Sequence, residues 1–422
     1  MANEKRYIGI RHRVKWSADG DALPTEVCIN QTGYDLASEQ DELDFAYSML
    51  PTAWVKPEPG DDLSSFEPHH VKWSKLRKNQ KMPEGIHKNQ IQQDKDGVTV
   101  ATGVPASYIG LEYGDIVAMT QGGSGDYFAY ALARQGEEVG ASVMRIPPFV
   151  FTKHRGDKSK DDDAKLLAAL VQTNPELFFA VSDRDFALIR VREAFIARTD
   201  AVKARIACGQ RLRQRVIGEI FCRPEGLYPE GGIEKRYDEL KANDVIYGAL
   251  ETEEAKRERE LGKCVPELDI YRKLFEPIEG CGPRIAAGII AAIGDIRRFE
   301  TDAKLKAFCG VHIQKDGKFA RLRHGQVANW SPDARQALYL LVDQFNRRPD
   351  SHWGAYLLQM KANLRGKHPE PIVGENGKKR YSNGHTHKMA LWRTATRFVE
   401  WLHKEWWKLE RARSRENLQD AA

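Results

Sequence analysis

The stretch that decides the fold is FEPIEGCGPRIAAGIIAAIGDIRRFETDAKLKAFCGV, residues 275–311. Gly280 and Gly282 bracket a tight turn, and the pattern that follows predicts a helix over Pro283–Ile293. Such a helix begins with free backbone N–H groups that can meet a phosphate, beside Arg284. The small residues along it allow a neighbouring helix to approach closely. The pattern predicts a compact helical hairpin, and it leaves open whether that hairpin binds a phosphate backbone or no ligand.

The whole chain has 422 residues, 41% hydrophobic and 30% charged, which is enough for two or three domains with a sizeable core. No apolar run reaches the roughly 18 to 20 residues of a membrane-spanning helix, and the first residues lack the apolar core of a signal peptide. We therefore expect a cytoplasmic protein with no membrane partner. The six cysteines form no CxxC pair, which argues against a zinc ribbon or a disulfide framework and favours reduced cysteines.

The charge is distributed unevenly. Residues 311–422 contain 21 Lys and Arg against 11 Asp and Glu, a net charge of +10, whereas the rest of the chain has 44 against 49. Six of the nine tryptophans also lie in this segment: Trp330, Trp353, Trp392, Trp401, Trp406 and Trp407. Cations beside flat aromatic rings suit a nucleic-acid surface, although a helical core with a solvated basic face would have the same composition.

The first part of the chain alternates between strand and helix patterns. Residues 6–29 predict a β-hairpin, and residues 51–95, rich in Pro, Gly, Lys and Gln without a sustained period, predict a long loop insertion. The alternation beyond it predicts an α/β layer. Its expected elements are strands at 108–112, 115–120 and 138–146 with a helix at 124–136.

The second part predicts mainly helices. A long helical stretch over 183–221 and a charged run over 234–263 could pair as an antiparallel hairpin. Another helix is expected to begin at the N-cap Ser331. An aromatic-rich stripe over 389–409 repeats every three or four residues, which favours burial over base stacking. From Arg411 we expect a disordered tail.

The block 275–311 resembles the C-terminal region of the insertion-sequence transposases known as bridge-RNA-guided recombinases. The resemblance implies an α/β RuvC-like (RNase H-like) N-terminal domain, then an α-helical coiled coil, then a helical nucleic-acid-binding domain. The expected boundaries are 1–166 with the insertion at 51–95, 167–262, 263–410 and a tail at 411–422.

The same block is similar to the Nop domain of box C/D ribonucleoproteins. With residues 327–358 and 380–407, the chain resembles best the Tas proteins of tandem interspaced guide RNA (TIGR-Tas) systems, which join a Nop-like part to optional nuclease domains. This resemblance implies RNA-guided targeting of DNA, with a guide RNA bound by the C-terminal Nop-like domain, target DNA as a second partner, and a homodimer.

The resemblance also assigns catalytic positions, which this chain fills differently. Arg11 stands where the family has its first metal-binding aspartate, and Thr120 where it has a glutamate. Asp163 matches the last aspartate, but Lys160 lies one turn earlier and leaves Asp161 and Asp162 as displaced substitutes. We therefore expect an inactive domain. If it is active, Asp161 and Asp163 would serve a Mg²⁺-dependent DNA endonuclease, and no other metal or cofactor is expected.

The family's other catalytic element is a serine nucleophile in a Ser-Gly-Lys context. Here the sequence reads Asp316-Gly317-Lys318, and no serine falls between Val311 and Asn329. Without that hydroxyl a covalent serine–DNA intermediate has no obvious origin. An insertion-sequence transposase or recombinase therefore remains the alternative function, and an RNA-binding Nop-like subunit without a DNA partner is a third.

Holding two polyanions requires clustered cations rather than many base-reading groups. His385 and His387 would share a face of an extended backbone, but the sequence offers no third ligand, so hydrogen bonding to RNA or a helix cap is favoured over a metal. The candidate nucleic-acid-binding residues are Gly280, Gly282, Arg284, Lys318, Arg321, Arg323, His324, Arg347, Arg348, Lys379, Arg380, His385, His387 and Lys388.

Overall fold

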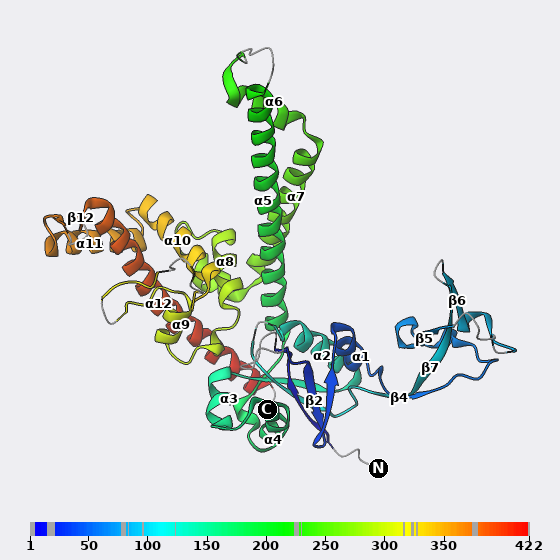
Figure 1. Ribbon diagram of the computed structural model, residues 1–422. Helices are drawn as coiled ribbons and strands as arrows, with labels where there is room; N and C mark the ends of the chain where they lie inside the picture. Colours follow the sequence, from blue (N-terminus) through cyan, green and yellow to red (C-terminus); the bar gives the residue numbers. More distant parts are fainter. Residues whose placement is uncertain are drawn as a thin grey trace. The chain divides into compact units, whose positions relative to one another are not determined.

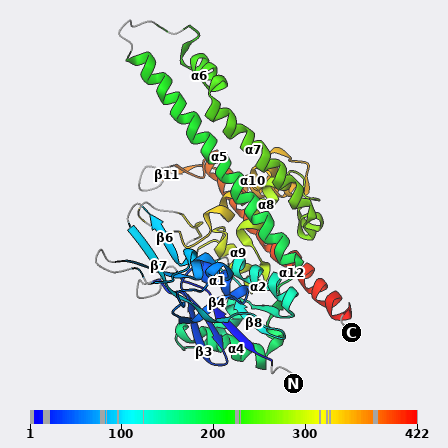
Figure 2. The ribbon, with the colours of Figure 1, turned by 90° about the vertical axis from the view of Figure 1, so that its right-hand side faces the viewer.

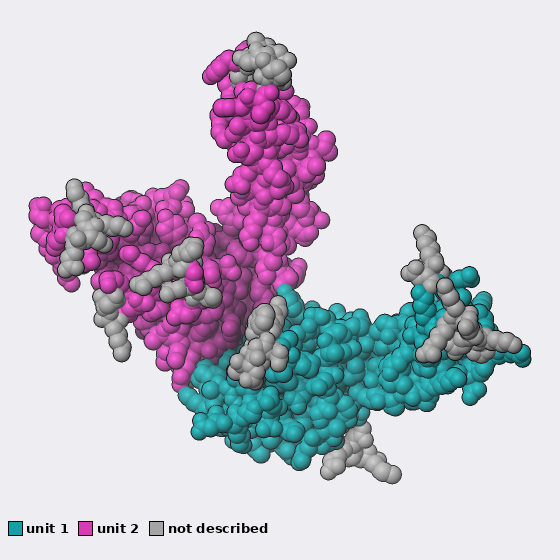
Figure 3. Space-filling view, viewed as in Figure 1, with its two compact units in different colours: residues 1–182 teal, residues 183–422 magenta. Residues whose placement is uncertain are grey.

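The computed structural model divides the chain into two compact units, residues 1–182 and 183–422, which Figure 3 shows in two colours. Each is described here by itself. The expected boundaries at 166 and 262 stay predictions. The structure describes residues 5–14, 22–76, 82, 84–94, 97–122, 124–222, 228, 230–314, 317–321, 325, 328–373 and 379–420.

A six-stranded mixed sheet forms the centre of the first unit (Figure 1). The strand order is β10-β9-β8-β1-β2-β3, with β1 antiparallel to β2 but parallel to β8, and β8 parallel to β9. The predicted opening hairpin and α/β layer are therefore confirmed. The strands are β1 (Tyr7–Arg11), β2 (Thr25–Ile29), β3 (Thr32–Leu36), β8 (Ile116–Thr120), β9 (Ser142–Ile146) and β10 (Phe179–Ala180).

One helix of this unit packs on β1 without intervening side chains. A Cβ atom on Gly9 would lie 1.8 Å from the carbonyl oxygen of Ala164 and 2.6 Å from the backbone nitrogen of Ala168. Only glycine allows this approach, which fixes the acidic start of α4 against the central strand. The helices are α1 (Glu39–Ala46), α2 (Asp126–Val139), α3 (Pro148–Arg155) and α4 (Asp163–Thr173).

The prediction of a long loop over residues 51–95 is wrong. This segment supplies three strands of a second sheet in which β4 and β5 flank β7, and β6 also pairs with β7. Most of β4 is exposed and β5 has four residues, so neither carries the apolar alternation that reveals a strand. The strands are β4 (Leu50–Val55), β5 (Lys72–Lys75), β6 (Ile91–Asp94) and β7 (Gly97–Ile109).

The second unit begins with a long helical hairpin. Helix α5 (Asp183–Phe221) is followed by α6 (Gly232–Asn243) and α7 (Val245–Cys264), and α7 lies along α5 in Figures 1 and 2. Arg198 pairs with Glu258 and Arg205 with Glu254, so the two helices are antiparallel, as predicted. The charged run is two helices rather than one.

The rest of this unit is a helical core with a small β-hairpin. The predicted helix over Pro283–Ile293 is confirmed as α8, and Val399, Leu402 and Trp406 of the aromatic stripe are buried, as expected. The expectation of a disordered tail from Arg411 is wrong, because α12 continues to Asp420. The remaining elements are α9 (Asp302–Phe308), α10 (Pro332–Arg347), α11 (His352–Lys367), β11 (Ile372–Val373), β12 (Lys379–Arg380) and α12 (Asn383–Asp420).

Two expectations about the chain as a whole can be compared with the structure. All six cysteines are free thiols, in agreement with the predicted lack of a disulfide framework. Within the described residues, no helix is both long enough and apolar enough to cross a bilayer.

Candidate nucleic-acid interface

A recess of about 550 Å³ beside α10 combines cations with aromatic rings. Arg335 and Tyr339 are four residues apart on α10 and therefore share a face of that helix. Trp330 comes from the turn before α10, and Trp392 comes from α12. The residues that line the recess are Arg321, Trp330, Pro332, Arg335, Gln336, Tyr339 and Trp392.

The guanidinium of Arg335 lies over two indole rings, those of Trp330 and Trp392. Its central carbon is 4.6 Å from the ring centre of Trp392 and 5.1 Å from that of Trp330. Its Nη1 donates a hydrogen bond of 2.8 Å to the carbonyl oxygen of Ala320. Burial lowers the pKa of Arg335, yet an arginine keeps its charge at neutral pH. The recess therefore contains a fixed cation that, among the described residues, has no carboxylate partner.

The aromatic wall is accessible from outside. The ring of Tyr339 is 6.0 Å from that of Trp392, and Tyr339 is 43% exposed. An exposed aromatic face can stack on an unpaired base while an arginine neutralises the adjacent phosphate. The recess has the chemistry to hold a nucleotide of a single strand.

Three of the predicted binding residues act on one another electrostatically. Burial lowers the pKa of His385, and the cations Arg321 and Arg380 lower it further. Nδ1 of His385 accepts a hydrogen bond of 2.9 Å from the backbone nitrogen of Tyr381, whose ring stacks on His368 at 3.6 Å. A cationic group thus extends from the recess residue Arg321 to the start of α12.

The expectation that His385 and His387 share a face is wrong. Both lie in α12, where residues two apart point to different sides of the helix. The pKa of His387 is lowered by burial and by Lys361, not by the cations that act on His385. Nδ1 of His385 instead accepts the hydrogen bond from the backbone nitrogen of Tyr381 just before α12, and the predicted role of His385 in nucleic-acid binding stays a prediction.

The predicted glycine turn lies against the C-terminal end of α10. Gly280 has a φ of +87°, and a Cβ atom there would lie 2.9 Å from Cβ of Gln344 and 3.0 Å from Nη1 of Arg348. Gly282 is the N-cap of α8 and makes no side-chain cap, while Arg284 is exposed in the first turn. The structure therefore brings Gly280 and Arg348 together.

The remaining predicted cations are dispersed. Arg347 forms an ion pair of 2.8 Å with Asp343, Lys318 follows a turn at Gly317, and Lys388 is exposed on α12. Lys379 belongs to the hairpin of β11 and β12. Arg323 and His324 lie outside the described residues.

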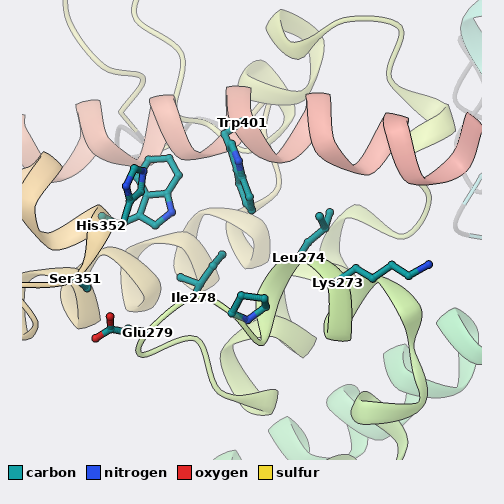
Figure 4. A pocket seen from close by; sticks show the side chains of 9 residues that line it. Lys273, Leu274, Ile278, Glu279, Ser351, His352 and Trp401 are labelled. Carbon is teal, nitrogen blue, oxygen red and sulfur yellow. The ribbon is translucent and has the colours of Figure 1, made fainter. Parts of the chain in front are cut away.

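A second recess, of about 240 Å³, has an apolar floor and a polar rim (Figure 4). Trp401 projects from α12 between His352 and Leu274, and Lys273 and Glu279 supply charges of opposite sign. This recess is smaller and its charges are mixed, so it suits a nucleotide less well than the first recess does.

The hydroxyl groups of Ser331 and Ser351 cap helices. Ser331 accepts from the backbone nitrogen of Ala334 at 3.2 Å, and Ser351 accepts from that of Gly354 at 3.1 Å. Ser351 also donates to the carbonyl oxygen of Arg348 at 2.8 Å. Neither hydroxyl has a base beside it in these contacts, so neither shows the arrangement of an activated nucleophile.

In the first unit, the ends of two parallel neighbouring strands carry no acid. Arg11 ends β1 and Thr120 ends β8, as the sequence indicates. Nε of Arg11 donates to a carboxylate oxygen of Glu26 at 3.3 Å, and its Nη1 donates to the carbonyl oxygen of Pro24 at 3.2 Å. A guanidinium at this edge would repel a divalent cation.

The acids predicted to hold Mg²⁺ do not form a ligand set. Nη1 of Arg155 donates to Asp163 at 2.8 Å, and the hydroxyl of Ser159 donates to Asp161 at 2.9 Å. Burial raises the pKa of Asp163, whereas Arg155 and Arg11 lower it. Mg²⁺ needs several oxygen ligands around one point, and among the described residues neither aspartate belongs to such a group. These residues do not fit Mg²⁺.

Arg335, Tyr339 and the role of Trp392 were not predicted from the sequence. The available signal was an arginine and a tyrosine four residues apart, at the edge of the apolar face of a predicted helix.

Two comparisons with known proteins bear on this region. No curated protein matches the chain. The model of the transposase IS116/IS110/IS902 family matches residues 272–357, a segment that contains most of the lining of both recesses. Over this segment, the chain is related to the IS110-type transposases.

Proposed function

We propose that this protein is an RNA-guided DNA-targeting protein that binds a guide RNA through the cationic and aromatic face of its second unit. The observation that carries the proposal is the guanidinium of Arg335, which lies over the rings of Trp330 and Trp392 beside an exposed tyrosine. It lies in a segment related to transposases, proteins that act on nucleic acid. The excess of positive charge in residues 311–422 supports the same proposal.

We further propose that the first unit is a RuvC-like domain that has lost its nuclease activity. The proposal is supported by a mixed sheet in which β3, β2 and β1 are antiparallel neighbours, β8 and β9 continue parallel to β1, and β10 is antiparallel to β9. The loss of activity is supported by Arg11 at the end of β1 and by the pairing of Asp163 with Arg155. DNA would then be held without being cut.

The first experiment is the isolation and sequencing of RNA that copurifies with the full chain. We expect one class of structured transcript in stoichiometric amount, and gel shifts of matching duplex DNA that require this RNA. Protein that is free of RNA, and that shifts no duplex when transcripts are added back, would contradict the proposal. Shifts of RNA without any response to matching DNA would favour a structural Nop-like subunit instead.

The second experiment concerns cleavage. With Mg²⁺ and guide-matched duplex we expect no cuts, and Asp161→Asn and Asp163→Asn should change nothing. Cuts that either substitution removes would show that a rearranged acid set is active.

A transposase or recombinase is the second candidate, and the family match favours it. It would need a nucleophile, which the capping of Ser331 and Ser351 argues against. Trapping a covalent protein–DNA adduct on cleavable substrates would establish this candidate, and we expect no adduct.

A further inference from the structure

One further group of side chains in the first unit has the composition of a metal site. Asp44 on α1 and the adjacent His69 and His70 each offer a ligand atom, and these atoms lie within 4.8 Å of one another. The histidines occupy the single helical turn Pro68–His70 between β4 and β5. It is the one group of three such side chains found among the described residues.

Both imidazoles direct Nε2 at the same carboxylate. Nε2 of His70 is 2.8 Å from Oδ2 of Asp44, and Nε2 of His69 is 3.3 Å from the same oxygen. Around a tetrahedral zinc ion, with bonds of about 2.0 to 2.2 Å, ligand atoms are separated by about 3.3 Å. The group therefore needs shifts of only a few tenths of an ångström at these two contacts to accept such an ion.

Two of the three proposed ligands are buried, and the third is accessible to solvent. The side chains of Asp44 and His70 are buried, whereas that of His69 is 41% exposed. Nε2 of Gln40 donates to Oδ1 of Asp44 at 2.9 Å and orients the carboxylate, as outer-shell groups do around metals. The ring of His70 lies 5.8 Å from that of Tyr108 on β7. An ion can therefore enter on the side of His69, where water would complete its coordination.

We propose that Asp44, His69 and His70 bind one Zn²⁺ ion. Two imidazoles and one carboxylate form a borderline ligand set that suits Zn²⁺, whereas Mg²⁺ prefers oxygen ligands. On binding, each imidazole gives its Nε2 lone pair to the ion in its neutral Nδ1–H form: a neutral ring moves the proton that Nε2 shared with Asp44 to Nδ1 through solvent, and a protonated ring releases its Nε2 proton to solvent. The ion would join α1 to the turn Pro68–His70 and so stabilise the second sheet against α1.

The test uses the full chain without an affinity tag, because histidine tags bind zinc, and with Cys222→Ser, because Cys222 is the exposed thiol among the six cysteines. After chelation and dialysis, calorimetric titration with Zn²⁺ should give one equivalent per chain. Added Zn²⁺ should raise the melting temperature, whereas Mg²⁺ should not. Co²⁺ should give the visible absorption of a low-coordinate site without a thiolate charge-transfer band.

Two variants identify the ligands. His69→Ala removes the accessible ligand, and Asp44→Asn keeps the shape of the buried one. Each should weaken Zn²⁺ binding by at least about 10- to 100-fold, the loss that even outer-shell changes cause. His154→Ala, which removes an exposed histidine of the same unit on α3, is the matched control and should bind like the parent protein.

The titration of the Cys222→Ser parent protein keeps the proposal falsifiable even if a ligand variant does not fold. A parent protein that takes up no Zn²⁺ would overturn it. So would uptake that both ligand variants leave unchanged, or a Co²⁺ spectrum that shows thiolate ligands.

Discussion

Arg335 shows how a single residue can prepare a binding surface. Its guanidinium is fixed by two indole rings and one carbonyl oxygen, so little side-chain entropy is left to lose when a ligand arrives. Burial has removed part of its hydration already, which strengthens its attraction for a phosphate. The adjacent Tyr339 offers a ring face to solvent.

Tyr339→Ala should weaken binding of single-stranded RNA, because stacking of one base contributes about 1 to 3 kcal/mol. We expect a loss of roughly 5- to 150-fold in affinity, measured by fluorescence anisotropy at fixed salt. The slope of affinity against salt should not change, since no charge is removed. Leu340→Ala is the matched control, because Leu340 is 45% exposed on the same helix but does not line the recess. If Tyr339→Ala and Leu340→Ala bind RNA with equal affinity, the recess is not part of the RNA-binding surface.

The recess shows which part of a site the sequence can predict. Arg321, Arg380 and His385 could be selected because cations cluster along the chain, and the structure places them in one electrostatic group. Arg335 could not be matched with Trp392, because their contact joins two helices more than fifty residues apart. The ion pair between Arg155 and Asp163 could not be predicted from the sequence either.

At the scale of elements, α1 is tied to the sheet by a buried carboxylate. Glu42 accepts hydrogen bonds from the hydroxyl of Thr25 at 2.6 Å and from Arg13, and lies 3.4 Å from Nε2 of His12. Burial alone would raise the pKa of Glu42, but His12, Arg13 and Thr25 outweigh it and lower the pKa to about 2. The ionised form is therefore strongly preferred in the folded protein.

Glu42→Gln should reduce stability at pH 7 by an amount on the order of 3 kcal/mol, measured by urea denaturation. A carboxyl whose pKa is lowered by folding stabilises above its unfolded pKa of 4.5, and this contribution is lost as the pH falls towards 2. The difference between variant and parent should therefore vanish near pH 2. Glu39→Gln, on the same helix and with an 82% exposed side chain, should cost no more than about 0.5 kcal/mol. A pH-independent difference for Glu42→Gln would show that its carboxylate is not the cause.

Long elements with a repeating apolar pattern were predicted well from the sequence, whereas short exposed strands were not. Helix α8 and the hairpin of α5 and α7 repeat an apolar pattern over several turns, so their existence follows from the sequence. The strands within 51–95 are short and largely exposed, and they are defined by pairing with β7 rather than by composition. A local sequence pattern carries no information about which distant segments pair as strands.

At the largest scale, each unit is closed by contacts that join distant segments. In the second unit, Arg184 of α5 bonds to Asp295 at 3.0 Å and to Glu410 of α12 at 2.6 Å, while Arg297 bonds to Asp185 at 2.8 Å. Burial by itself raises the pKa of Asp295, but Arg184 and Arg297 hold it well below its usual range. The network ties the first and last helices of the unit together.

Arg184→Met should destabilise the second unit by about 3 to 5 kcal/mol, because it leaves buried carboxylates without their main partner. Urea unfolding followed by tryptophan fluorescence measures this, since Trp406 donates to Glu410 within the network. Arg190→Met is the control on the same helix, where a 69% exposed arginine pairs with Glu267, and should stay within about 0.5 kcal/mol. If Arg184→Met lowers the free energy of unfolding only slightly, apolar packing of the methionine can replace the ion-pair network.

The contact between Gly9 and α4 bears on how this fold could change its chemistry. Because the strand and the helix meet through backbone atoms, the seat of α4 does not depend on which side chain occupies position 11. If the first unit is RuvC-like, as we propose, carboxylates exchanged for Arg11, Thr120 and Lys160 would be added to a strand and a helix whose packing through Gly9 does not change.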